Sequence, residues 1–182
     1  MRAGCPSPVL VELGKRKPLE KRRLPRVSEA SPSASQPDMI TELLLASAAF
    51  APMPTRWVDA VEHIESSGRG AATPPGDFGL AKGPFQFHRS AWSDCSEARR
   101  KAGLPTYPYS KASDPLIARQ YATSWLSYLR ARLIIKLGRM PNLGETWLAY
   151  NLGMTGFSRY GYRIDFVPER KMRKAATLNA AQ

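Results

Sequence analysis

The segment between residues 114 and 138 constrains the fold more than any other part of this chain. Asp114 precedes Pro115, and this pair is typical of a helix start because proline suits the first helical position, where its missing N–H is not needed. Large apolar side chains then recur at spacings of three and four residues, at Leu126, Leu129, Leu133 and Leu137. This period predicts a helix with one buried face that ends at Gly138.

A second helix is predicted over residues 56–66, with Thr55 as its N-cap. Apolar side chains share one arc of this helix, at Trp57, Val58, Val61 and Ile64. Glu65 falls within the same arc. Burial of a carboxyl group is costly unless the group is paired or protonated. Two interpretations follow for Glu65: an ion pair with a cation such as Arg69, or a functional acid whose pKa is raised by burial.

The remaining elements are shorter. Glycine and proline residues between 68 and 84 indicate turns and short strands. We expect further helices over residues 85–92 and 143–152, with Gly153 ending the second of these. The fold class is therefore mainly α, a helical domain of about residues 52–168 with a short turn or β region. Residues 169–182 are predicted to be a basic C-terminal tail that either frays or adds one loose helix.

The first 51 residues are predicted to lie outside this domain. Residues 1–38 combine a basic run with a Ser/Pro/Ala segment, a composition typical of disorder because it buries little apolar surface. Residues 39–51 contain a short apolar run that ends in Ala-Phe-Ala, like a secretory cleavage site. Its acidic flank and its distance from Met1 argue against a signal, and a helix packed on the domain is the alternative.

Charge and cysteine content limit the kinds of partner and the kinds of chemistry expected of this chain. The formal net charge is +12, which favours polyanionic partners such as an acidic cell wall, nucleic acid or an anionic membrane. The two cysteines do not make a disulfide framework, and Cys95 is interpreted as structural. No apolar run reaches the roughly 20 residues of a membrane-spanning helix. The sequence has no Cys/His metal cluster and no phosphate-binding glycine loop, so no metal or cofactor is expected.

Three short motifs occur in a fixed order and carry a resemblance. They are Ile-Glu-Ser-Ser at residues 64–67, Gly-Pro-Phe-Gln-Phe at 83–87 and Ala-Tyr-Asn-Leu-Gly at 149–153. Together they resemble the active-site framework of the lysozyme-like superfamily, which includes lytic transglycosylases and goose-type lysozymes. The likeness spans about residues 55–163. Leu152 departs from the small residue that the family carries at that position.

The resemblance implies a lysozyme-like fold whose short β region lies beside an active-site cleft. Glu65 would be the general acid that cleaves the β-1,4 bond between N-acetylmuramic acid and N-acetylglucosamine in peptidoglycan. Ser66, Gln86, Tyr150 and Asn151 would bind the glycan near it. The protein would act as a monomer, either exported or associated with a phage.

A second likeness is to invertebrate-type lysozymes, which carry an Asp ahead of the Gly-Pro motif and a Trp-x-Asp-Cys motif after it. Here these are Asp77 and residues 92–95, although the abundant cysteines of that subfamily are missing. Asp77 is then a candidate second catalytic carboxylate, as a hydrolase requires, whereas a lytic transglycosylase needs only the acid. The capping of a turn is the alternative role for Asp77.

Two rival functions remain open from the sequence. One is a lysozyme-like protein that binds glycan without cutting it. The other is a basic nucleic-acid-binding protein, which the charge suggests but no recognised motif supports. Single side chains outside the three motifs have simpler roles: His88 is expected at the surface, and Trp57, Trp125 and Trp147 are expected in the core.

Overall fold

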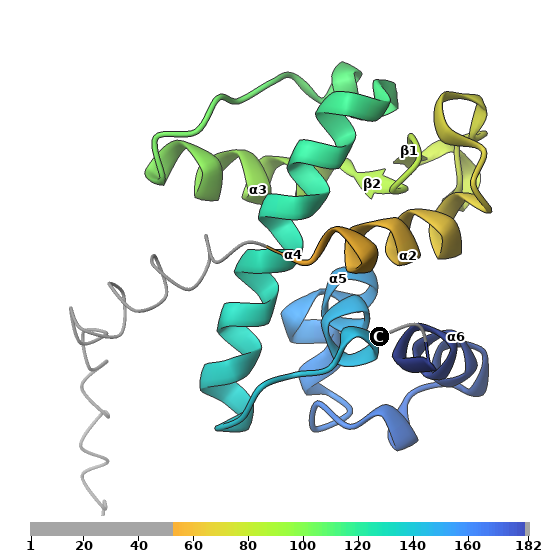
Figure 1. Ribbon diagram of the computed structural model, residues 1–182, viewed down its shortest axis with the longest axis vertical. Helices are drawn as coiled ribbons and strands as arrows, with labels where there is room; N and C mark the ends of the chain where they lie inside the picture. Colours follow the sequence, from red (N-terminus) through yellow and green to blue (C-terminus); the bar gives the residue numbers. More distant parts are fainter. Residues whose placement is uncertain (1–52, 181–182) are drawn as a thin grey trace, which may run out of the picture. The chain divides into compact units, whose positions relative to one another are not determined.

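The computed structural model describes residues 53–180, and the long central helix is its main organising element. Helix α4 spans Pro115–Leu137, and the Asp114 carboxylate caps its start by accepting hydrogen bonds from the N–H groups of Leu116 and Ile117. Gly138 ends it with a left-handed backbone. Both ends are those predicted from the sequence, and Figure 1 shows α4 running past the other helices.

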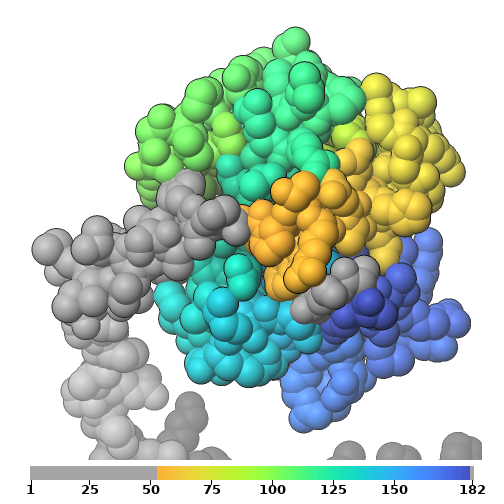
Figure 2. Space-filling model, viewed as in Figure 1, coloured from red at the N-terminus to blue at the C-terminus, as the bar shows by residue number. Residues whose placement is uncertain are grey.

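The apolar face of α4 forms the middle of the core. Leu126 and Leu133 are fully buried and Leu129 nearly so. Three helices pack against α4: α2 (Thr55–Ser66), α3 (Arg89–Lys101) and α5 (Leu143–Ser158). Figure 2 shows α2, in orange, at the middle of one face, with the green α3–α4 region on one side and the blue C-terminal helices on the other. The predicted mainly α fold class is confirmed.

Between α2 and α3 the chain makes short elements. These are the 3-10 turns η1 (Gly70–Ala72) and η2 (Asp77–Gly79) and the antiparallel strands β1 (Ala81–Lys82) and β2 (Phe87–His88). The prediction of turns and short strands in this region is confirmed. A further 3-10 turn, η3 (Tyr109–Ser113), precedes α4.

Two details near the helix starts were predicted wrongly. Helix α2 begins at Thr55 itself, with Pro54 before it and no side-chain cap. Residues 85–88 are not helical, because Gln86 has a left-handed φ of 49° and Phe87 pairs with Lys82 in the sheet. The helix expected over 85–92 therefore starts later and runs over α3.

Helix α5 begins where the sequence predicts and extends further. Asn142 and Glu145 form a reciprocal capping box at its start. Gly153, with φ 71° and ψ 160°, breaks the helical geometry as expected, but helical residues resume and continue to Ser158. The 3-10 turn η4 (Ile164–Phe166) then leads to α6.

The C-terminal segment is part of the folded domain, so the prediction of a tail after residue 168 is wrong for the described residues. Helix α6 (Glu169–Ala180) packs against α5 and α2. Ala175 and Leu178 are buried in the same core as α4, and the N–H of Gly144 donates to Asn179 Oδ1 at 2.7 Å. Helix α6 is amphipathic, but its apolar side is narrow, with Ala175 and Leu178 as its buried residues. Basic and small residues make up most of the segment, so its sequence did not indicate a packed helix.

Aromatic rings join the hairpin to the helices. The Phe87 ring packs edge-to-face on Trp92 of α3 at 5.2 Å and on Tyr150 of α5 at 5.5 Å, between ring centroids. Trp92 in turn stacks on Tyr121 of α4 at 3.7 Å. Trp57, Trp125 and Trp147 are buried, as predicted. The motif residues at 83–87 therefore contribute to the core as well as to the surface.

No helix within residues 53–180 is long and apolar enough to cross a membrane. The expectations for residues 1–51, including the basic tail and the signal-like run at 39–51, lie outside the described residues. Cys5 lies there too. Cys95 is fully buried, and burial raises the pKa of its thiol to about 12, which supports the structural role predicted for it.

Gly83→Ala tests how tightly the hairpin is seated. A Cβ at this position would lie 1.7 Å from the carbonyl oxygen of Ala112, at a φ of 72°. We expect a loss of about 3 kcal/mol in the free energy of unfolding, combining left-handed strain with overpacking. Chemical denaturation of the full chain measures it.

Gly103→Ala is the matched control, because Gly103 has a φ of 70° but a Cβ added there would meet no atom within 4 Å. It should lose only about 1 kcal/mol from backbone strain. Equal losses in both variants would contradict the close approach at Gly83.

Candidate functional site

A cleft of about 420 Å³ opens where α2, the hairpin, α5 and the start of α6 meet. Its walls are formed by side chains from these four regions, from η2 and from α3. They are Glu65, Asp77, Ala81, Gln86, Phe87, His88, Ala91, Trp147, Tyr150, Asn151, Pro168, Arg170, Lys171 and Lys174. The structure thus brings together residues from all three sequence motifs.

Glu65 lies in the wall of this cleft, one residue before the end of α2. Because Glu65 shares the apolar arc of the helix, its side chain is partly buried rather than directed into solvent. Its Oε1 accepts a hydrogen bond of 2.6 Å from the indole N–H of Trp147 in α5. Among the described residues Glu65 makes no ion pair with Arg69, so the interpretation as a structural ion pair is not supported.

The surroundings of Glu65 raise its pKa. Burial is the dominant cause, because it disfavours the charged form. The hydrogen bond from Trp147, the positive charges of Lys174 and Lys171, and the amide of Asn151 act in the opposite direction and offset only part of this effect. The result is a carboxyl group that retains its proton at a higher pH than an exposed glutamate, which is the property required of a general acid.

The two lysines near Glu65 come from α6. Lys174 Nζ donates to the carbonyl oxygen of Ile64 at 3.3 Å and lies 5.9 Å from the centre of the Trp147 ring. It therefore holds the last turn of α2 against α5. Lys171 Nζ donates to Asn151 Oδ1, and desolvation lowers its pKa.

Asp77 and His88 form a pair contributed by η2 and β2, and both residues line the cleft. His88 Nε2 lies 2.8 Å from Asp77 Oδ2. Among the described residues, the hydrogen-bond partner of the Asp77 carboxylate is His88, so the structure gives no support to the alternative role as a turn cap. Asp77 and Phe78 both have left-handed φ values, of 45° and 57°, a strained arrangement that is common at functional sites.

Gln86 is held rigidly at the cleft wall. Its amide nitrogen donates to the carbonyl oxygens of Gly83 at 2.9 Å and Pro74 at 3.2 Å. Its Oε1 lies so close to Gly76 that a side chain there would approach it within 2.1 Å. The Gln86 side chain therefore ties the loop before η2 to the hairpin as well as facing the cleft.

The other predicted glycan-binding residues have different positions. Tyr150 and Asn151 both line the cleft, and the Tyr150 hydroxyl donates to the carbonyl oxygen of Phe85 at 2.6 Å. Burial raises the pKa of Tyr150 well above its usual value. Ser66 was predicted wrongly: it is buried outside the cleft, and its hydroxyl donates to the carbonyl oxygen of Glu62 at 2.7 Å.

Five polar or charged side chains of the cleft were not predicted as site residues. Trp147 was expected only in the core and His88 only at the surface, and Arg170, Lys171 and Lys174 were placed in a tail. The sequence did contain one indication of the two lysines: Lys171 and Lys174 are three residues apart, which places them on one side of a helix. Within residues 53–180 no group of three or more His, Cys, Asp or Glu side chains is arranged to hold a metal ion.

Comparisons with models of protein families, with curated proteins and with solved structures found no match to this chain.

The raised pKa of Glu65 predicts a pH dependence of stability. A carboxyl group with a raised pKa in the folded state binds more protons there than in the unfolded chain. Stability contributed by the neutral group is therefore present at low pH and is lost as pH rises from 4.5, the ordinary value of the group, through the folded-state pKa. For a single proton the loss in that window is at most about 1.4 kcal/mol per pH unit.

Glu65→Gln removes this titration and still accepts the bond from Trp147. We expect the variant to gain stability relative to the wild type as pH increases through the window, measured by urea unfolding at a series of pH values. Glu97→Gln, on an exposed part of α3, is the control. A stability difference independent of pH at Glu65 would contradict the raised pKa.

Proposed function

We propose that this protein cleaves the β-1,4 glycosidic bonds of peptidoglycan, with Glu65 as the general acid. The observation that carries the proposal is the environment of Glu65: a carboxyl group with a raised pKa, oriented by Trp147 and exposed to a cleft that also contains Asp77. The three sequence motifs, which resemble those of lysozyme-like enzymes, meet around this group.

In this mechanism the sugar chain lies in the cleft with the scissile oxygen at the Glu65 carboxyl. Glu65 donates its proton to the leaving oxygen while positive charge develops at the anomeric carbon. Trp147 fixes Oε1 through its N–H, so the second oxygen is the one that carries the proton. The carboxylate left behind is then stabilised by the nearby charges of Lys171 and Lys174.

The position of Asp77 favours hydrolysis over intramolecular ring closure. Its side chain faces the cleft and is held at one oxygen by His88, which leaves the other oxygen to orient water or to attack the anomeric carbon. A lytic transglycosylase has no need of a second carboxylate held in this way. We therefore propose a muramidase that acts where it meets the cell wall, either after export or as part of a phage.

The products distinguish these activities. We expect the full chain to release peptidoglycan fragments with reducing ends, each one water heavier than an anhydro product, as read by mass spectrometry. Glu65→Gln preserves the shape of the site but has no acid proton, so its rate should fall by at least about 100-fold. Asp77→Asn should also be slow if water is activated there.

If the products are anhydro fragments and Asp77→Asn is fully active, the protein is a lytic transglycosylase and the proposed hydrolase is rejected. Binding of glycan without fragments from any variant would leave a binding protein in place of an enzyme. Asp94→Asn is the control for a carboxylate change outside the cleft, on the surface of α3.

Trp147→Phe tests the orientation of the acid. Because the indole N–H lowers the pKa of Glu65, its removal should raise that pKa further. A general acid works only while protonated, so activity declines as pH rises through its pKa, and this alkaline limb should move to higher pH in the variant. Trp125→Phe, a buried tryptophan on α4, should leave the limb unchanged. A limb that stays in place or moves to lower pH in Trp147→Phe would count against the assigned contact.

A further inference from the structure

The positive charge of the cleft comes from a single helix. Among the lining residues, the lysine and arginine side chains are Arg170, Lys171 and Lys174, all on α6. We call these three residues the α6 cation row. The acidic residues of the lining are Glu65 and Asp77, and at a pH where Glu65 keeps its proton only Asp77, already paired with His88, opposes the row.

Two members of the row are engaged with the protein. Lys174 binds the carbonyl oxygen of Ile64 at the end of α2, and Lys171 binds the Asn151 side chain. Both also lie close enough to Glu65 to influence its charge. Their positions explain how α6 stabilises the catalytic region, and their ammonium groups are partly satisfied without any ligand.

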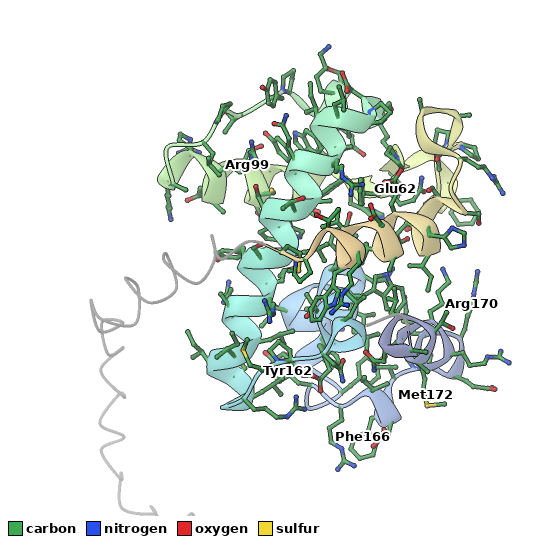
Figure 3. The ribbon with its side chains drawn as sticks, in the orientation of Figure 1. Glu62, Arg99, Tyr162, Phe166, Arg170 and Met172 are labelled. Carbon is green, nitrogen blue, oxygen red and sulfur yellow. The ribbon has the colours of Figure 1, made fainter. Side chains whose placement is uncertain are left out.

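Arg170 differs from both lysines. Its side chain is exposed, and within residues 53–180 its guanidinium makes neither a hydrogen bond nor an ion pair. The adjacent Glu169 pairs instead with Arg173, at 3.6 Å, one turn further along α6. Figure 3 shows Arg170 extending away from α6. The cleft wall therefore presents a free guanidinium group.

We propose that Arg170 is a specificity-determining residue that binds a carboxylate of the glycan and so selects an acidic amino-sugar polymer over a neutral one. This inference rests on the proposed function, since it concerns the substrate of the same cleft. A guanidinium offers two parallel N–H donors to a carboxylate, and this bidentate geometry is not matched by the hydroxyl and acetamide groups of neutral sugars.

Peptidoglycan and chitin separate these chemistries. Both are β-1,4 polymers built on N-acetylglucosamine, but chitin carries no carboxylate. In peptidoglycan the carboxylate comes from one of two sources: the stem peptide, or the lactyl group of muramic acid once the peptide has been removed. Arg170 binds the same chemical group in either case, and glycan strands with and without peptides distinguish the sources.

The experiment compares Arg170→Gln with Arg173→Gln, which removes the same charge from the same helix but from a residue that does not line the cleft. Both are made in full-length chains that also carry Glu65→Gln, so that glycan is not consumed. Calorimetry then measures binding of soluble peptidoglycan strands with stem peptides, the same strands after amidase treatment, and chitin oligosaccharides of equal length.

We expect Arg170→Gln to weaken binding of at least one acidic strand about tenfold, as loss of a charge-assisted hydrogen bond does, and to leave chitin binding unchanged. Arg173→Gln should bind all three glycans as the parent does. A loss confined to peptide-bearing strands assigns the stem carboxylate, and a loss with amidase-treated strands assigns the lactyl carboxylate.

The inference is overturned if Arg170→Gln binds acidic strands as tightly as the parent does. It is also overturned if Arg170→Gln loses as much affinity for chitin as for acidic strands, or if Arg173→Gln loses as much affinity for acidic strands as Arg170→Gln does. Absence of any binding to acidic strands by the parent chain overturns it as well. Turnover of peptidoglycan by chains with native Glu65 is measured separately. Arg170-dependent binding without turnover therefore rejects the proposed enzyme and retains the carboxylate site.

Discussion

The buried face of α4 is the constraint on which the rest of the structure depends. Leu126, Leu129 and Leu133 exclude water along one side of the helix, and α2, α3 and α5 bury their own apolar faces by packing on it. Because apolar burial is the main favourable contribution to folding, this arrangement fixes the position of the last turn of α2 relative to Trp147 of α5. The candidate acid and its tryptophan partner are thereby brought together.

The cleft is an extension of the core. Phe87 packs on rings from α3, α4 and α5, and the Tyr150 hydroxyl binds the backbone of Phe85. The hairpin is therefore positioned by aromatic packing on one side while Gln86 faces the cleft on the other. A site supported in this way holds its polar groups in fixed orientations, as the proposed reaction would require for stabilising developing charge.

Two opposing influences act on the pKa of Glu65 in the cleft. Burial favours the protonated form of Glu65, and the indole N–H of Trp147 with the lysines of α6 favours the carboxylate. A general acid must hold its proton before the reaction and must be stable as a carboxylate after donating it. Burial would serve the first requirement, and the Trp147 N–H and the lysines would serve the second. Helix α6 therefore has two roles in the cleft. Lys174 binds the end of α2, and Lys171 and Arg170 contribute positive charge.

Local patterns in the sequence determined much of this protein. The Asp-Pro start and glycine end of α4, the apolar period of its side chains and the arc containing Glu65 all follow from short-range rules of helix geometry. The mainly α class and the partly buried acid were predictable for that reason. Such rules depend on residues one or two turns apart, and these lie within a single element.

Only the tertiary structure decided which distant residues meet. The bond between Trp147 and Glu65 joins residues 82 positions apart, and Trp147 has the same apolar periodicity whether or not its N–H finds a partner. Strand β2 depends on pairing with β1 and on the left-handed turn at Gln86, which override the helical pattern of residues 85–92. Helix α6 becomes part of the site because its few apolar side chains dock on the core formed by other elements, a long-range contact that no local pattern specifies.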